Sequence, residues 1–419
     1  MSRLLVRPSG PLTGAVQIQG AKNSALKLMA ACLLAEGRYV LRNVPRISDV
    51  DHMCDLLEAM GLSTRWREDG ALEIIRGHDV IPAAPYELVE RMRASSAVIG
   101  PLLASVGRAS VAMPGGDNFG SRPIDMHLQG LEEIGASFEV DRGVIRGKAS
   151  QLIGTDVVLD YPSVGATENL LMAASTAKGV TVIHNAAREP EIADLAAFLN
   201  RMGARIIGAG GPTISIEGVE ELRAVEHSVI PDRIEVATFL CALGVVGGEI
   251  SLVGARLDHI ELLVEKLGMI GLRVSPERGG IWAMAKERPK PVDIATLPYP
   301  GLATDYLPMI VTLLCFADGT SYATENVFAG RFRYLAELER MGATVRIEDH
   351  HMVIDGVPRL TGAPVKALDI RAGAAMVIAG MGAEGETVIA DSQHVDRGYE
   401  NFEDRLRSIG ADITELDDE

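Results

Sequence analysis

Hydrophobic and polar positions follow two periods along this chain of 419 residues, and glycine marks the change between them. Amphipathic runs with helical spacing end in an apolar residue and a glycine. Alternating apolar and polar residues then follow, as at 343–347. Glycine after a helix adopts the left-handed conformation without a Cβ clash, and period-two alternation is typical of a half-buried strand. The pattern therefore predicts a helix that leads directly into a strand at each such glycine.

This helix–glycine–strand pattern recurs about every 70 residues, which indicates a sixfold repeat. The glycines that end the helices are Gly61, Gly135, Gly203, Gly271, Gly342 and Gly410. In a second series with the same period, a helix rich in small residues precedes Gly37, Gly107, Gly179, Gly248, Gly319 and Gly385. We expect each repeat to contain a strand, a helix, a strand, a helix and one or two more strands. Because such a repeat is longer than a usual solenoid unit, closed groups are expected rather than an open stack.

Length and composition indicate a globular α/β protein. A chain of this length is expected to form two domains of about 200 residues each. Its 47% apolar and 4% aromatic residues are typical of soluble proteins. No apolar run approaches membrane-spanning length, and the first residues lack the layout of a signal peptide, so a cytoplasmic protein without membrane association is expected.

Net charge and cysteine content limit the classes of ligand that the chain is expected to bind. A net charge of −17 argues against a nucleic-acid partner. An anionic ligand would therefore need a local cluster of basic side chains. Four cysteines lie in apolar helical stretches without metal-type spacing, and we expect them to be buried and reduced: Cys32, Cys54, Cys241 and Cys315.

Two short motifs are better explained as turns than as ligand sites. Residues 208–211 contain three glycines, but a strand pattern follows them, so they predict a hairpin turn rather than a dinucleotide loop. The sequence Asp-His-His at 349–351 joins two strand patterns. It predicts an exposed turn rather than a metal site.

Three segments carry candidate chemistry. The glycine-rich loop at 114–123 holds Asp117 and Arg122, and its composition fits a mobile lid or an ordinary surface loop. Lys22 lies at a strand-to-helix junction, where it could hold an anion or be a solvated side chain at a plain helix start. Asp305 precedes an apolar helix, where aspartate is common as a helix-start residue.

Together these segments resemble the enolpyruvyl transferases over essentially the whole chain. The resemblance rests on residues 20–23, 92–95, 114–127, 162–167, 185–191, 231–235, 304–305, 327–328 with Arg331, and 396–399. It implies an α/β fold of two domains, each with three βαβαββ-type repeats in a pseudo-threefold array. The N-terminal domain would span 21–230 and carry the lid loop 113–123. The C-terminal domain would combine 1–20 with 231–419, and the active site would lie in the interdomain cleft.

The resemblance also implies a reaction. Phosphoenolpyruvate would donate its enolpyruvyl group to the 3-hydroxyl of UDP-N-acetylglucosamine and release phosphate, by addition and elimination through a tetrahedral ketal. This is the first committed step of peptidoglycan precursor synthesis. No metal or organic cofactor is implied. The ketal carries a phosphate and a carboxylate, so several cationic side chains would have to surround it.

Residues that match the family's motifs are expected to carry these roles. The catalytic residues implied are Asp117, Asp305, Lys22 and Arg397. Lys22, Arg122 and Arg397 would surround the phosphate, and Arg331, Arg371 and Arg397 the carboxylate. Asp305 would be the base at the sugar hydroxyl, with a pKa raised toward neutrality. The remaining substrate contacts implied are Asn23, Arg93, Pro123, Ile124, Asp125, Met126, Ser163, Val164, Gly165, Glu189 and Val327.

Two positions depart from the commoner family pattern. Most members carry cysteine where this chain has Asp117, although a subset carries aspartate and keeps the activity. Asp117 would then be the general acid, and the enzyme would be insensitive to fosfomycin, an epoxide that alkylates the lid cysteine. The second departure is at Arg333 and Tyr334, which could tune the acceptor site.

Two alternatives therefore remain open. One is a paralogue that acts on another uridine nucleotide in secondary metabolism. The other is a non-catalytic paralogue that binds a nucleotide sugar, although the retention of Lys22, Asp305 and Arg397 together argues against it.

Overall fold

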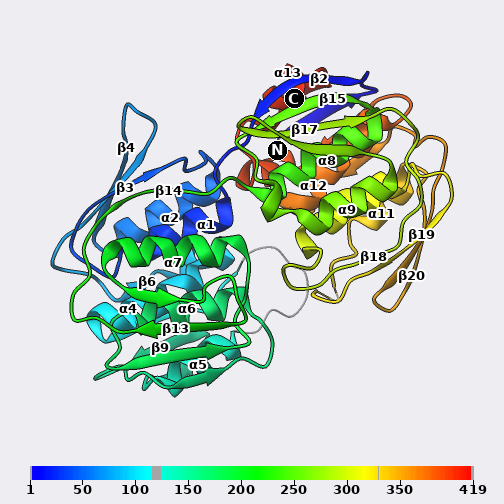
Figure 1. Ribbon diagram of the computed structural model, residues 1–419. Coiled ribbons are helices and arrows are strands. Elements are labelled where there is room, and N and C mark those ends of the chain that lie inside the picture. The colour runs from blue at the N-terminus through cyan, green and yellow to red at the C-terminus, as the bar shows by residue number, and fades with distance from the viewer. Residues whose placement is uncertain (1, 116–123, 329, 417–419) are drawn as a thin grey trace. The chain divides into compact units, whose positions relative to one another are not determined.

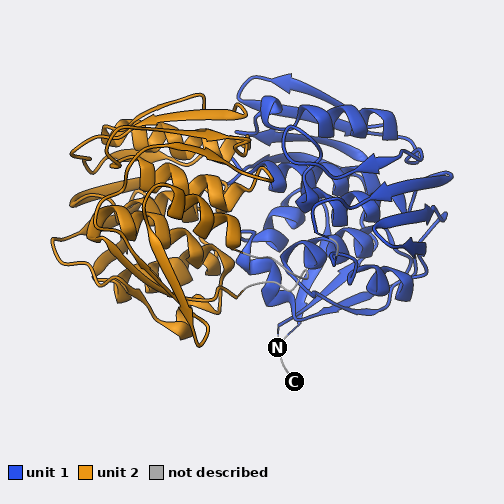
Figure 2. Ribbon diagram, turned by 90° about the horizontal axis from the view of Figure 1, so that it is seen from below, with its two compact units in different colours: residues 1–19, 118–121, 231–419 blue, residues 20–117, 122–230 orange. Residues whose placement is uncertain are grey.

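The computed structural model describes residues 2–115, 124–328 and 330–416 (Figure 1). These residues form two compact units (Figure 2). We call residues 20–115 and 124–230 the N unit, and residues 2–19 and 231–416 the C unit. A separate hydrophobic core fills each unit.

Each unit contains three four-stranded sheets, and every sheet has the same plan. The first strand of a repeat pairs in parallel with the second. The fourth strand then lies between the second and the third and runs antiparallel to both. The N unit has sheets of order β14-β3-β5-β4, β6-β7-β9-β8 and β10-β11-β13-β12. The C unit has sheets of order β2-β15-β17-β16, β18-β19-β21-β20 and β22-β23-β1-β24.

The three repeats of the N unit follow the order strand, helix, strand, helix, strand, strand. The first contains β14 (Glu226–Ser228), α1 (Lys22–Ala31), β3 (Gly37–Arg42), α2 (Ser48–Ala59), β4 (Leu62–Trp66) and β5 (Leu72–Arg76). The second contains β6 (Ala83–Ala84), α4 (Ile99–Val106), β7 (Arg108–Ala112), α5 (Asp125–Glu133), β8 (Ser137–Asp141) and β9 (Val144–Lys148), with α3 (Tyr86–Val89) and the 3₁₀ helix η1 (Arg93–Val98) inserted after β6. The third contains β10 (Asp156–Val158), α6 (Val164–Ala174), β11 (Val180–His184), α7 (Pro190–Met202), β12 (Arg205–Ile207) and β13 (Thr213–Glu217).

The C unit repeats the same order and draws two strands from the start of the chain. Its first repeat contains β2 (Leu12–Gln17), α8 (Arg233–Val246), β15 (Gly248–Val253), η2 (Leu257–His259), α9 (Glu261–Ile270), β16 (Arg273–Glu277) and β17 (Gly280–Ala285). The second contains β18 (Ile294–Ala295), η3 (Thr304–Tyr306), α10 (Leu307–Leu314), β19 (Thr320–Thr324), α11 (Leu335–Arg340), β20 (Thr344–Glu348) and β21 (His351–Asp355). The third contains β22 (Pro364–Lys366), α12 (Ile370–Gly382), β23 (Thr387–Ala390), η4 (Ser392–Arg397), α13 (Phe402–Ser408), β24 (Asp412–Leu416) and β1 (Arg3–Arg7).

The glycine pattern has the predicted structural cause. Every glycine of both series has a positive φ. Gly203 caps α7 with φ 112° and Gly271 caps α9 with φ 121°, and a strand follows each within a few residues. The six βαβαββ repeats are therefore confirmed.

The first helices of the C-unit repeats form its centre. Helices α8, α10 and α12 contact one another pairwise and are buried along nearly their whole length. A helix that is apolar on all sides is stable only inside a core, which explains their near-continuous runs of Ala, Val, Leu and Ile. Because these helices cannot shift without opening the core, the residues at their N-termini are held at fixed positions.

Both predicted turns are confirmed, and so is most of what was predicted for the cysteines. Residues 208–211 lie in the turn between β12 and β13, and residues 349–350 in the turn between β20 and β21. All four cysteines are free, and Cys32, Cys241 and Cys315 are buried. The prediction of burial was wrong for Cys54, which is only partly buried because its position on α2 lies toward the edge of the core.

Candidate active site

Asp305 lies in η3, immediately before α10, and its carboxylate is flanked by two guanidinium groups. Arg331 Nη1 donates to Asp305 Oδ1 at 2.6 Å, and Arg371 Nη2 lies 3.7 Å from Oδ2. Burial by itself would raise the pKa of Asp305, but the positive charges of Arg331, Arg371 and Arg233 outweigh it and hold the pKa below its usual value. The expectation of a pKa raised toward neutrality is therefore wrong for this structure.

Two arginines of the C unit are buried rather than solvated. Arg331 is 3% exposed and Arg371 is 4% exposed. Arg371 lies in the first turn of α12, where Asp369 caps the helix by accepting the backbone N–H groups of Arg371 and Ala372. Its guanidinium lies 5.2 Å from the centre of the Tyr399 ring.

One donor atom of Arg371 is left without a hydrogen-bond partner among the described residues. Its Nη1 is buried and has no hydrogen-bond partner within the described residues. Asp305, Asp232 and Tyr399 raise the pKa of Arg371 despite its burial, so it stays charged. Because a buried donor left unsatisfied is costly, a ligand carboxylate at this atom would be favoured. Arg397, the last residue of the same repeat's η4, is half-buried, and η4 packs against α12.

Glu325 joins these residues to Val327, and the sequence analysis did not identify its role. The carboxylate is 1% exposed and accepts the Thr304 hydroxyl at 2.7 Å through Oε2. Its Oε1 accepts the backbone N–H groups of Val327 and Phe328 at 2.7 and 3.0 Å. Glu325 directly follows a strand pattern, and that position was its only sequence signal.

Lys22 is the candidate cation of the N unit with the firmest placement. It begins α1, is 7% exposed, and its Nζ lies 2.6 Å from Asp49 Oδ2. Asp49 is itself 2% exposed. The alternative of a solvated lysine at a plain helix start is therefore excluded. Asn23, the next residue of α1, is partly buried.

The N-terminus of α6 groups several predicted contacts of the nucleotide sugar. Ser163 caps the helix by accepting the Ala166 N–H at 3.4 Å. Gly165 is required there, because an added Cβ would lie 2.6 Å from the His127 ring. Burial, with Arg93 and Lys27 nearby, lowers the pKa of His127 to about 4, so His127 is neutral near pH 7. Val164 is partly buried in the first turn.

The other predicted N-unit contacts lie at further helix starts. Arg93 begins η1, is partly buried and donates to the Pro114 carbonyl at 3.5 Å. Ile124 is buried before α5, whose first residues Asp125 and Met126 are exposed and partly buried, respectively. Glu189 is buried before α7. The remaining predicted residues Asp117, Arg122 and Pro123 lie outside the described part of the chain.

A buried ion pair of the N unit was also not predicted from the sequence. Lys27 Nζ lies 2.7 Å from Glu168 Oε2, and Glu168 is 1% exposed. Burial raises the pKa of Glu168 to about 7, although Lys27 opposes the shift, while Glu191 and Glu189 add to it. Neither residue belonged to a recognised segment, so only the fold reveals the pair.

Comparison with known proteins identifies the family. The profile of EPSP synthase (3-phosphoshikimate 1-carboxyvinyltransferase) matches residues 6–406. The chain belongs to the enolpyruvyl transferase family. The protein from Caldanaerobacter subterraneus named UDP-N-acetylglucosamine 1-carboxyvinyltransferase 1 is 48% identical, with 98% of this chain and 99% of that one covered. A Mycobacterium tuberculosis protein named UDP-N-acetylglucosamine 1-carboxyvinyltransferase is 47% identical, with 98% of each covered.

Solved structures share the fold of this enolpyruvyl transferase. The enolpyruvyl transferase NikO from Streptomyces tendae aligns with a TM-score of 0.88 at 23% identity, over 99% of each chain. EPSP synthase from Acinetobacter baumannii aligns with a TM-score of 0.76 at 19% identity, over all of both chains. The predicted two-domain enolpyruvyl transferase fold is thus confirmed.

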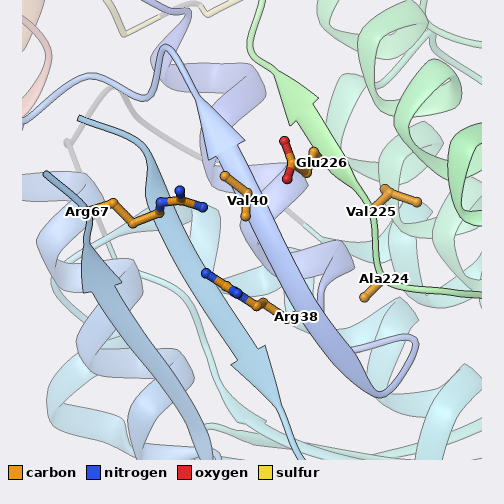
Figure 3. Close-up of a pocket in the computed structure, with 6 residues that line it drawn as sticks. All are labelled: Arg38, Val40, Arg67, Ala224, Val225 and Glu226. Carbon is orange, nitrogen blue, oxygen red and sulfur yellow. The ribbon is translucent and has the colours of Figure 1, made fainter. Parts of the chain in front are cut away.

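A hollow of about 390 Å³ lies elsewhere on the N unit of this transferase (Figure 3). Arg38 on β3 and Arg67 after β4 border it, opposite Glu226 on β14. Both arginines already have carboxylate partners, since Arg38 pairs with Glu73 and Arg67 with Asp69. None of the predicted site residues lines the hollow, so it is not the candidate active site.

The described residues contain neither a recognisable metal site nor a membrane-spanning helix. No group of His, Cys, Asp and Glu there has the arrangement of a metal site. No helix in that part of this transferase is long and apolar enough to cross a membrane.

Proposed function

We propose that this chain transfers the enolpyruvyl group of phosphoenolpyruvate to the 3-hydroxyl of UDP-N-acetylglucosamine and releases phosphate. The observation that carries the proposal is the 48% identity, over nearly the whole of both chains, to a relative named for this acceptor. In a cell that builds peptidoglycan, the reaction would be the first committed step of its precursor synthesis. The protein would then act in the cytoplasm.

The proposed mechanism begins with addition. The sugar 3-hydroxyl oxygen bonds to C2 of phosphoenolpyruvate, and Asp305 accepts the hydroxyl proton. Asp117 protonates the C3 methylene, which becomes a methyl group. In the elimination, the bond from C2 to the phosphate oxygen breaks, C3 returns a proton to the Asp117 carboxylate, and phosphate leaves with the proton held by Asp305. Each step needs a proton acceptor or donor at a fixed position, which aspartates can supply.

The lowered pKa of Asp305 has a physical role in this scheme. An ionised carboxylate is ready to accept a hydrogen bond from the sugar hydroxyl, but it is a weak base beside Arg331 and Arg371. If the donor carboxylate binds these arginines, it offsets their positive charge. The pKa of Asp305 then rises, and the residue becomes a stronger base only in the complex with both substrates.

Both units are proposed to supply residues to one active site. The candidate phosphate ligands divide between Lys22 of the N unit and Arg397 of the C unit. The Lys22–Asp49 pair is buried, so Lys22 is held in one place before an anion binds. The proposed general acid, Asp117, would complete the site.

No specific observation favours an acceptor other than UDP-N-acetylglucosamine. Tyr334, one of the two departures from the commoner pattern, is 2% exposed and lies in the core of the C unit. Arg333 is exposed.

Phosphate release in the presence of phosphoenolpyruvate and a panel of acceptors tests the proposal. The panel contains UDP-N-acetylglucosamine, UDP-glucose, UMP and shikimate 3-phosphate. We expect release with the first compound only. Release with UMP alone would support the alternative of a paralogue in secondary metabolism, and release with shikimate 3-phosphate alone would overturn the proposed acceptor class.

A further inference from the structure

Glu325 connects the segment after β19 to Asp305 through a chain of hydrogen bonds. On one side, its Oε1 accepts three donors: the Thr296 hydroxyl at 2.8 Å and the backbone N–H groups of Val327 and Phe328. On the other side, its Oε2 accepts the Thr304 hydroxyl at 2.7 Å. The carboxylate therefore ties the segment after β19 to the residue that precedes Asp305.

The chain continues from Thr304 to the candidate base. Arg331 Nη1 donates both to Thr304 Oγ1 at 3.1 Å and to Asp305 Oδ1 at 2.6 Å. A hydroxyl has one hydrogen to donate. Because Thr304 gives its hydrogen to Glu325, the Thr304 oxygen must present a lone pair to Arg331. Glu325 thus sets the polarity of the hydrogen bond that helps to hold Arg331 against Asp305.

Only an ionised carboxylate can accept all the hydrogen bonds that are made at this position. All four partners of Glu325 are donors, and an ionised carboxylate is purely an acceptor. In Glu325→Gln, the two backbone N–H groups would keep the amide oxygen on their side. The amide NH₂ would then face Thr304 as a donor and compete with Arg331 for the same oxygen. The substitution therefore changes the Thr304 side and preserves the Val327 side.

We propose that Glu325 is a positioning residue for the transfer reaction, acting through Thr304 and Arg331 on the Asp305 carboxylate. The inference rests on the proposed function, because it assigns to Asp305 the role of base. Glu325 is buried and touches no substrate in this scheme. Its effect should appear in turnover, since misplacement of a catalytic group slows the chemical step more than it weakens binding.

Steady-state kinetics of four variants tests the proposal. Glu325→Gln and Thr304→Val each break the link from one end, and kcat should fall about 10- to 100-fold in each. The KM for UDP-N-acetylglucosamine should stay within about threefold, because the Val327 side is preserved. Thr304→Ser keeps the hydroxyl and should retain kcat within about threefold. The double variant Glu325→Gln/Thr304→Val should lose no more kcat than the more impaired single variant, since both changes break the same link.

A matched control separates this role from general damage. Glu337, another buried glutamate of the C unit, accepts the Lys366 N–H at 3.1 Å and pairs with Arg340. Among the described residues it has no hydrogen bond to Thr304, Asp305 or Arg331. Glu337→Gln should leave kcat unchanged. A kcat within about threefold of wild type in Glu325→Gln, or losses that multiply in the double variant, would overturn the proposal.

A second measurement does not depend on turnover. The midpoint of thermal unfolding is compared for Glu325→Gln, Asp305→Asn and the double variant. If one hydrogen-bonded chain connects the residues, the shift of the midpoint in the double variant should be smaller than the sum of the shifts in the two single variants. A shift equal to that sum would contradict the inference. Absence of phosphate release by the wild-type protein would reject the proposed function, while this comparison would still decide whether Glu325 is coupled to Asp305.

Discussion

Two opposing effects act on the pKa of Asp305: partial burial raises it, and the two arginine guanidinium groups beside the carboxylate lower it. In Asp305→Asn the amide oxygen can still accept from Arg331, but the side chain no longer accepts a proton. Turnover should therefore fall about 10²- to 10⁴-fold. Calorimetry should show UDP-N-acetylglucosamine bound with nearly wild-type affinity. Turnover close to that of the wild type would remove Asp305 from the mechanism.

Asp117 is expected to determine the response to fosfomycin. A carboxyl group is a far weaker nucleophile toward an epoxide than a thiolate is, so the wild-type protein should form no adduct. Asp117→Cys should stay active and become sensitive, and Asp117→Asn should be nearly inactive because an amide donates no acidic proton. Intact-mass spectrometry after incubation with fosfomycin checks all three proteins. An adduct on the wild type, or full activity of Asp117→Asn, would contradict this role.

Glu168 should make the stability of the N unit depend on pH. Its pKa rises from 4.5 to about 7 in the folded state, so the folded state holds the proton more tightly than the unfolded state does. The contribution of Glu168 to stability is thus fully present below about pH 4.5 and is lost as the pH rises through about 7. Glu168→Gln removes this titration.

Denaturant unfolding at pH 5 and pH 8 measures the effect of Glu168. The free energy of unfolding should fall more between these pH values in the wild type than in Glu168→Gln, by roughly 1–3 kcal/mol. Lys27 remains in both proteins, so its contribution to the pH dependence is largely shared. Equal pH dependence of the two proteins would show that Glu168 does not titrate in this range.

At the scale of elements, helix α9 offers an internal comparison of two glycines. Gly271 ends the helix with φ 121°, whereas Gly268 is an exposed helical residue with no atom near its would-be Cβ. Gly271→Ala should destabilise the protein by about 1–2 kcal/mol, because alanine is strained at positive φ. Gly268→Ala should stabilise it by up to about 1 kcal/mol through higher helix propensity. Denaturant unfolding of the two variants gives both values, and equal effects would contradict this account of the repeat.

The periodic elements could be predicted from the sequence because each has a local cause. The glycines after α7 and α9 and the alternation in β20 are visible within a few residues. The shortest strands could not be predicted. β6 and β18 span two residues each, too few to show a period, and both form only by pairing in parallel with the next strand of their sheet. The 3₁₀ helix that contains Thr304 and Asp305 likewise gave no pattern of its own.

At the scale of the whole molecule, the candidate site depends on contacts between distant segments. Arg331 is 26 residues from Asp305 in sequence, and Arg371 comes from the next repeat. The resemblance predicted that these residues act together, but it did not predict that the arginines would lower the pKa of the base. That result depends on burial and distance, which follow from the packing of α10 against α12.

Each unit should be necessary for turnover. Lys22→Gln in the N unit keeps a hydrogen-bond donor for Asp49 but removes a positive charge. Arg397→Met removes both the positive charge and the hydrogen-bond donors of the C unit's candidate phosphate ligand. Loss of one charge-assisted contact to a transferring phosphate should lower kcat/KM at least about 100-fold in either variant. Circular dichroism serves as the control for folding. Full activity in a folded variant would remove that unit from the proposed phosphate site.

The most direct test of the central claim is to identify the product nucleotide. The wild-type protein is incubated with phosphoenolpyruvate and UDP-N-acetylglucosamine, and the nucleotide fraction is examined by mass spectrometry and NMR. We predict a uridine nucleotide that carries an enolpyruvyl ether on the sugar 3-oxygen, formed in step with free phosphate. An unchanged nucleotide, or phosphate released without the ether, would contradict the proposed transfer.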